Sequence, residues 1–178
     1  LRMAAEGFAT IRSGLGETDR AVALLRDPNG AFVRTATAHP EDEFAVRGRL
    51  LLSEILSGRG DLKGAEEALA AIGDRALPPE LGWERGFLMA RLKVGTGKIQ
   101  EAYPLSTNLT ASIPASIPPE RRAAALLLEA ELLDRLGQTD PALQTYQRHL
   151  AECPARPQPG TANERYCSLS LAGSGCWH

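Results

Sequence analysis

"LLDRLGQTDPALQTY", residues 132–146, contains the motif that decides the fold: a glycine, an alanine five residues after it, and an apolar run on either side. The chain carries this motif four times, as "GETDRA" (Gly16 to Ala21), "GDLKGA" (Gly60 to Ala65), "GKIQEA" (Gly97 to Ala102) and "GQTDPA" (Gly137 to Ala142). The glycines stand roughly 40 residues apart, a period typical of arrays of helical hairpins.

The motif has a local physical explanation. Glycine ends a helix at low cost because it accepts a positive φ, and a small alanine lets two antiparallel helices approach closely. Apolar residues before and after each glycine are spaced by three and four, which indicates helices and not strands. Each motif therefore predicts a turn between two helices.

Proline and acidic residues mark where the first helix of a pair begins. "HPED" starts at His39, "LPPE" at Leu77 and "IPPE" at Ile117. Proline suits the first helical turn, where its missing N–H costs nothing, and an acid there favours the helix dipole. These signals predict four pairs, near residues 1–28, 40–73, 78–112 and 118–152. Residues 28–40 form an unusually long connection, and Pro104 should kink the second helix of the third pair or delay its start.

Composition agrees with an all-α protein. The chain is rich in Ala, Leu, Glu and Arg, and aromatic residues make up only 5% of it. The formal net charge of −2 provides no basic field for nucleic acid. The longest apolar run, Ala123 to Leu128, is far shorter than the ~20 residues of a membrane span, so we expect no membrane insertion.

The pattern resembles the tetratricopeptide repeat (TPR) family over residues 1–152. In that family an alanine of the second helix follows the glycine by five residues, as Ala21, Ala65, Ala102 and Ala142 do here. The large residue four positions further on is matched by Leu25, Leu69 and Tyr146, whereas Ser106 departs. The family's tryptophan and its first-helix tyrosine are absent from their usual places, so the chain resembles a degenerate member.

The resemblance implies a right-handed α-solenoid whose concave face is lined by the first helix of each pair. The family positions place on that face Arg47, Leu50, Glu54, Glu84, Phe87, Arg91, Leu127, Glu131 and Asp134. These residues are suited to holding a peptide or a helix, or they form a solvated face with scattered ion pairs. Phe87 and Arg91, one helical turn apart, are the best candidate contact pair.

The sequence therefore predicts a protein-binding module and not an enzyme, with no cofactor. The partner would be another protein or a peptide, not nucleic acid. "GTGK" at residues 95–98 lacks the length of a phosphate-binding loop and coincides with a repeat turn. The alternative is a structural subunit, held in a larger complex through its convex face or its tail.

Residues 153–178 differ in character, with prolines, small polar residues and all three cysteines. We expect an irregular tail that caps the last pair or is partly disordered. A disulfide between Cys167 and Cys176, or between Cys153 and either, is an alternative. Another alternative is a zinc site with His149 and His178 beside the cysteines. A fourth is an enzyme-modified peptide behind a leader-like domain.

The compartment depends on these cysteines. Reduced cysteines would favour the cytoplasm, and a disulfide would indicate the periplasm or the cell exterior. The chain begins at Leu1 with helix-like sequence, which is typical of a fragment or a processed product.

Overall fold

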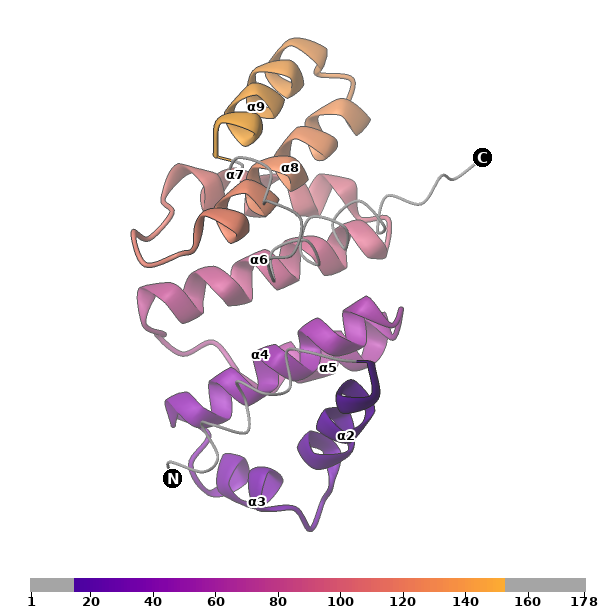
Figure 1. The fold of residues 1–178 in the computed structure, drawn as a ribbon, viewed down its shortest axis with the longest axis vertical. Coiled ribbons are helices and arrows are strands. Elements are labelled where there is room, and N and C mark those ends of the chain that lie inside the picture. The colour runs from indigo at the N-terminus through magenta and orange to yellow at the C-terminus, as the bar shows by residue number, and fades with distance from the viewer. Residues whose placement is uncertain (1–14, 153–178) are drawn as a thin grey trace, which may run out of the picture. The chain divides into compact units, whose positions relative to one another are not determined.

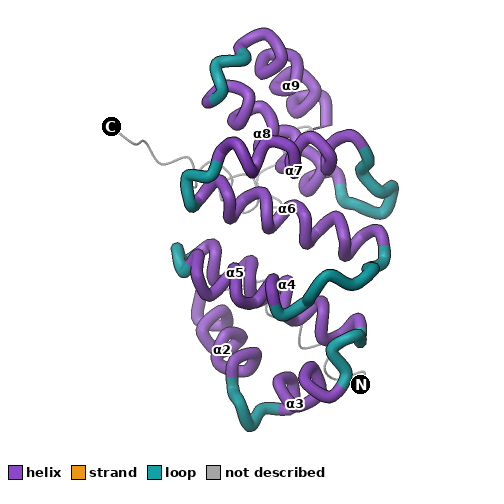
Figure 2. The backbone as a smooth tube through the Cα atoms, turned by 180° about the vertical axis from the view of Figure 1, so that it is seen from behind, coloured by secondary structure: helices purple, strands orange, loops and turns teal. Residues whose placement is uncertain are grey.

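The computed structural model describes residues 15–152, and this part of the chain is all-α (Figure 1). Its helices are α2 (Leu15–Arg26), α3 (Ala31–Ala38), α4 (Glu43–Gly58), α5 (Leu62–Ala70), α6 (Pro79–Gly95), α7 (Ile99–Ala111), α8 (Pro119–Arg135) and α9 (Thr139–Glu152). Short turns and loops join them (Figure 2), and no strand occurs in the described range. The prediction of an all-α fold is confirmed for these residues.

The chain divides into two compact units, and the boundary in the sequence lies between Thr96 and Gly97. Helices α2 to α6 belong to the first unit, and α7 to α9 belong to the second. The two units are described separately below.

Helix α4 is the centre of the first unit, where it contacts α2, α3, α5 and α6. Its buried residues recur at helical spacing, and most of them are apolar. One hydrophobic cluster joins α2, α4, α5, the loop after α5, and α6: Leu25, Val46, Leu50, Leu52, Leu56, Ala65, Ala68, Leu69, Ile72, Leu81, Leu88 and Leu92. Burial of these side chains holds the helices of the unit together.

Three of the predicted turn glycines lie at turns. Gly60, Gly97 and Gly137 have φ of 80°, 74° and 74°, and the next helix begins two residues after each of them. After α4 the N–H of Asp61 donates to the carbonyl of Leu56, and after α8 the N–H of Gln138 donates to that of Leu133. These bonds satisfy the last carbonyls of each helix, and they need a glycine in the left-handed region.

Gly16 differs from this pattern. It lies inside α2, so the turn predicted at that residue is not found there. Ala21, five residues later, is nevertheless fully buried, as are Ala65, Ala102 and Ala142 at 3% exposure or less. The predicted first helix of the first pair, before Gly16, lies outside the described residues.

The connection predicted over residues 28–40 contains a helix. α3 occupies eight of these residues and packs on α4. The ring of Phe32 in α3 packs against the backbone of Gly48 in α4, so closely that a Cβ at residue 48 would overlap it. In addition, Arg49 Nη2 donates to the carbonyl of Ala36 at 3.0 Å. Tertiary contacts therefore stabilise a helix too short to be stable alone.

The proline signals are confirmed at two helix starts, because Pro79 and Pro119 each occupy the first helical position. Before α4, Asp42 is the N-cap, and its carboxylate accepts the N–H of Phe44 at 3.0 Å. Pro104 lies inside α7, which nevertheless begins at Ile99 as the glycine spacing requires. Of the two predicted effects of Pro104, the late start is therefore wrong, and the kink stays a prediction.

The second unit is built on α8, which contacts both α7 and α9. α8 and α9 form a helical hairpin across Gly137, and Ala142 and Thr145 of α9 are buried. Eight of the 17 residues of α8 are buried, and one of them is Glu129, at 7% exposure. This unit repeats the turn geometry of the α4–α5 hairpin.

Candidate functional site

The residues predicted to line a concave face all lie on first helices of the predicted pairs. Arg47, Leu50 and Glu54 lie on α4; Glu84, Phe87 and Arg91 on α6; and Leu127, Glu131 and Asp134 on α8. The α4 and α6 sets belong to the first unit, and the α8 set belongs to the second.

The α4 set is partly buried in the core. Leu50 is 3% exposed and belongs to the hydrophobic cluster, so it stabilises the unit and offers little surface to a partner. Arg47 is exposed and pairs with Glu43 one turn earlier, with 2.7 Å between Nη2 and Oε1. Such an exposed pair adds little stability.

On α6 the structure brings Phe87 and Arg91 together, which their four-residue spacing on one helix allows. The guanidinium carbon of Arg91 lies 5.8 Å from the centroid of the Phe87 ring. Trp83 stacks on Phe87 one turn earlier, with centroids 5.5 Å apart and an angle of 10° between the rings. Both rings are buried, whereas Arg91 is exposed. The stack therefore holds a surface cation in place through a cation–π contact.

Sequence reasoning missed Trp83 as a member of this stack. The signal was present, because Trp83, Phe87 and Arg91 follow one another at four-residue spacing and so share one side of a helix.

On α8, Glu131 lies in a partly buried, charged neighbourhood. Burial raises the pKa of Glu131, and the nearby Arg135 and His149 oppose this shift. Burial also raises the pKa of Tyr146, and the charges of Glu131 and Asp134 add to that shift. The ring of His149 donates from Nδ1 to the carbonyl of Ala123 at 2.8 Å, which ties α9 to α8. This cluster is a surface of mixed charge with no evident nucleophile.

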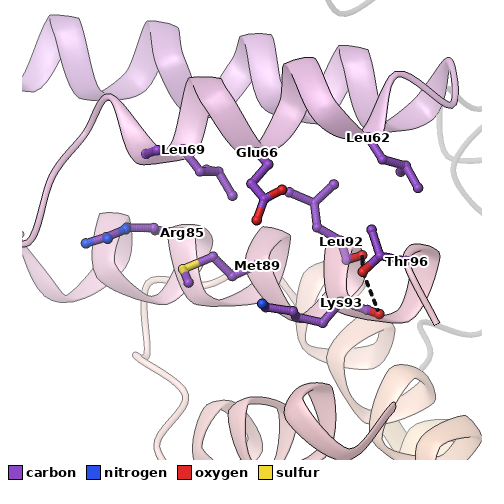
Figure 3. A pocket seen from close by; sticks show the side chains of 9 residues that line it. Leu62, Glu66, Leu69, Arg85, Met89, Leu92, Lys93 and Thr96 are labelled. Carbon is purple, nitrogen blue, oxygen red and sulfur yellow. Dashed lines mark hydrogen bonds between the residues drawn. The ribbon is translucent and has the colours of Figure 1, made fainter. Parts of the chain in front are cut away.

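A cavity in the first unit lies between α5 and α6, with a volume of about 170 Å³ (Figure 3). Its lining consists of Leu62, Glu66, Leu69, Ala70, Arg85, Met89, Leu92, Lys93 and Thr96. None of these residues was predicted as a site residue, because the cavity forms only where the two helices pack together. Pockets for drug-sized ligands are typically several hundred Å³, so this cavity is smaller than such pockets.

The described residues show no sign of a metal centre or of a membrane span. No three His, Cys, Asp or Glu side chains gather in residues 15–152 in a way that could hold a metal ion. Within the same range, no helix combines the length and the apolar character needed to cross a bilayer. The predicted disulfide and zinc alternatives involve Cys153, Cys167, Cys176 and His178, all of which lie outside the described residues.

Comparison with known proteins gives no match to this chain among protein-family models, curated proteins or solved structures.

Proposed function

We propose that this protein is a TPR-like helical repeat that binds a peptide or a helix of another protein and catalyses no reaction. In this proposal the predicted pairs stack as a right-handed solenoid, and the first helices present the binding face. The proposal is supported by the turn geometry shared by the α4–α5 and α8–α9 hairpins, each with a positive-φ glycine and a buried alanine.

The observation that carries the binding role is the exposed Arg91 on a buried aromatic stack. An arginine whose side chain is already ordered loses less conformational freedom when it binds a partner. Arginine is also enriched among the residues that dominate protein interfaces. The partner would therefore present a carboxylate, or another acceptor, to the α6 surface at Arg91.

A specific observation favours the alternative of a structural subunit. On α9, Leu143 and Leu150 are 58% and 70% exposed, and they lie two turns apart on one side of the helix. By the TPR resemblance α9 is a second helix, and second helices line the convex face. A larger assembly would cover these leucines in that case.

The two functions are separated by charge-reversal and apolar-to-polar variants of the full-length chain. The tagged protein is incubated with extract of the cells that encode it, and retained proteins are identified by mass spectrometry. Arg91→Glu should release the partner, whereas the matched variant Arg34→Glu, at an exposed site on α3, should retain it.

The recovered partner is then titrated in purified form against each variant. If the partner binds to the face formed by the first helices, Arg91→Glu should raise its Kd by about 30-fold or more. Leu143→Gln or removal of residues 153–178 could instead release the partner while Arg91→Glu retains it. In that case the structural-subunit function is correct, and binding through the first helices is wrong.

A further inference from the structure

The α5–α6 cavity has an apolar floor and a charged rim. Leu69 and Leu92 are buried in its floor, and Met89 covers its centre (Figure 3). Three rim residues, Glu66, Ala70 and Thr96, are exposed, so the cavity opens to solvent. An apolar surface of this kind gains free energy when an apolar group of a partner displaces its water.

The volume of the cavity limits what it can hold. A cavity of about 150 Å³ lined by apolar side chains accommodates a benzene molecule. The α5–α6 cavity, at about 170 Å³, therefore has room for one phenyl or one branched aliphatic side chain. It is suited to a single anchor residue, of the kind that dominates many protein interfaces.

The charge at the rim specifies what should lie beside that anchor. α6 contributes Arg85 and Lys93, and α5 contributes only Glu66. Arg85 and Lys93 lie about 12 Å apart along α6, because a helix rises 1.5 Å per residue. Met89 stands midway between them, one turn from each, so a cation lies on either side of the apolar centre.

Arg85 is the better-defined of the two cations. Its side chain is 19% exposed, and its Nη2 pairs at 3.2 Å with Asp74, which is wholly exposed. Its Nε is buried and has no hydrogen-bond partner among the described residues. A fully solvated acid is a weak partner for a largely buried guanidinium. A carboxylate from a docked protein could replace Asp74, and it would be shielded from water there.

We propose that the α5–α6 cavity is a docking site for a helix of a partner protein that carries one large apolar side chain and a carboxylate one turn away. The apolar side chain fills the cavity over Met89, and the carboxylate pairs with Arg85. Glu66 of α5 extends toward the middle of the cavity (Figure 3). Its negative charge would repel an acid placed directly beside the apolar side chain of the partner helix, so such a helix is excluded.

This site goes beyond the function proposed above. At 100° per residue, the cavity residues of α6 lie nearly opposite the side that carries Arg91. A variant at either place therefore leaves the other surface intact, and the two proposals fail independently.

A helical probe peptide tests the site directly. The peptide is alanine-rich, about 17 residues long, with one phenylalanine and a glutamate four residues before and after it. Glutamates on both sides allow the peptide to lie in either direction across the α5–α6 cavity. Two control peptides replace the phenylalanine by alanine, or both glutamates by lysine.

Methionine signals report binding because the chain has only two methionines, Met3 and Met89. The full-length protein is labelled at the methionine methyl carbons, and Met89→Leu assigns the two resonances. We expect the probe to shift the Met89 signal in a saturable manner. The alanine peptide should bind about 30-fold more weakly, and the lysine peptide at least about fivefold more weakly.

Protein variants complete the test. Ala70→Phe fills the cavity from an exposed position and should abolish binding, whereas the neighbouring Ala71→Phe, which does not line the cavity, should leave it unchanged. Glu66→Gln should strengthen binding of the probe, because it removes a like charge. Circular dichroism confirms that each variant is folded.

Three results would overturn the proposal. The first is the absence of any Met89 shift at millimolar probe. The second is equal binding of the probe and either control peptide. The third is unchanged binding by Ala70→Phe. The peptide controls are measured on the unaltered protein, so the test holds even if Ala70→Phe or Glu66→Gln fails to fold.

Discussion

Replacing Gly48 by alanine tests how α3 is held against α4. Gly48 lies within α4, where alanine is the better helix former by about 1 kcal/mol. A Cβ at this position would overlap the ring of Phe32, so the ring or the whole of α3 must move. Overpacking costs about 1–3 kcal/mol in a well-packed site. We therefore expect Gly48→Ala to lower the free energy of unfolding by about 1 kcal/mol net.

The surroundings of Phe32 explain why the ring cannot simply rotate away. Its centroid lies 5.6 Å from that of Phe44, with the rings tilted by 59°. Ala36, one turn later in α3, is 2% exposed, and its carbonyl accepts the bond from Arg49. Displacement of the ring would weaken these contacts, so Gly48→Ala should lower stability mainly by weakening the packing of α3 on α4.

Two controls separate packing from helix propensity. Gly58 lies in the same helix, and a Cβ there would meet nothing within 4 Å, so Gly58→Ala should stabilise by about 0.5 kcal/mol. In a Phe32→Ala background, Gly48→Ala should also become stabilising, because the ring is gone. Thermal unfolding followed by circular dichroism detects these effects as shifts of about 2–4 °C per kcal/mol. If Gly48→Ala raises the melting temperature as Gly58→Ala does, the reasoning is refuted.

The remaining predictions concern caps, repeat alanines and pH. Asp61→Ala removes the side chain that accepts the third N–H of α5 at 2.9 Å and should cost about 1 kcal/mol in a urea titration, while Asp61→Asn keeps most of it. Ala65→Trp and Ala142→Trp should each lose more than about 3 kcal/mol, because both sites are buried, whereas Ala151→Trp on the surface of α9 should melt normally. Burial raises the pKa of Glu131 in the folded protein, so ionisation of its carboxyl group opposes folding. The fold is more stable while this group is protonated, and that stability is lost as the pH rises through the raised pKa. Glu131→Gln should therefore stabilise the protein at pH 7 but not near pH 4; an equal gain at both pH values would contradict this assignment.

Helix ends were predictable from sequence because their signals are local. A glycine with positive φ can close a helix whatever lies elsewhere, and Gly60, Gly97 and Gly137 do so. Pro79 and Pro119 start helices for an equally local reason, since the first turn needs no proline N–H. The same reasoning failed at Gly16, which lies inside α2.

α3 was missed because its stability does not come from its own eight residues. A helix of two turns is unstable alone, and its sequence shows no capping side chain at Gly30. The helix forms because Phe32 finds a surface without a side chain at Gly48, a residue sixteen positions later. The period-based prediction could not connect these two residues.

Among the candidate site residues, Phe87 and Arg91 are one turn apart on one helix, a spacing that allows the contact seen between them, and their role in binding a partner stays a prediction. The sequence could not predict that Leu50 is buried, because a family position specifies a helix face and not what packs against it. It could not predict the cavity between α5 and α6 at all. That cavity depends on how closely two helices approach, which a difference of one side chain can change.

The sequence by itself determined that the described chain is helical, where most helices begin and end, and which alanines are buried, because these properties depend on backbone preferences and residue spacing within a few turns. Only the tertiary structure decided that α3 forms on α4, and that Arg85 and Met89 of α6 border a cavity with α5. These features arise from packing between segments distant in sequence, where volumes and contacts must match in three dimensions.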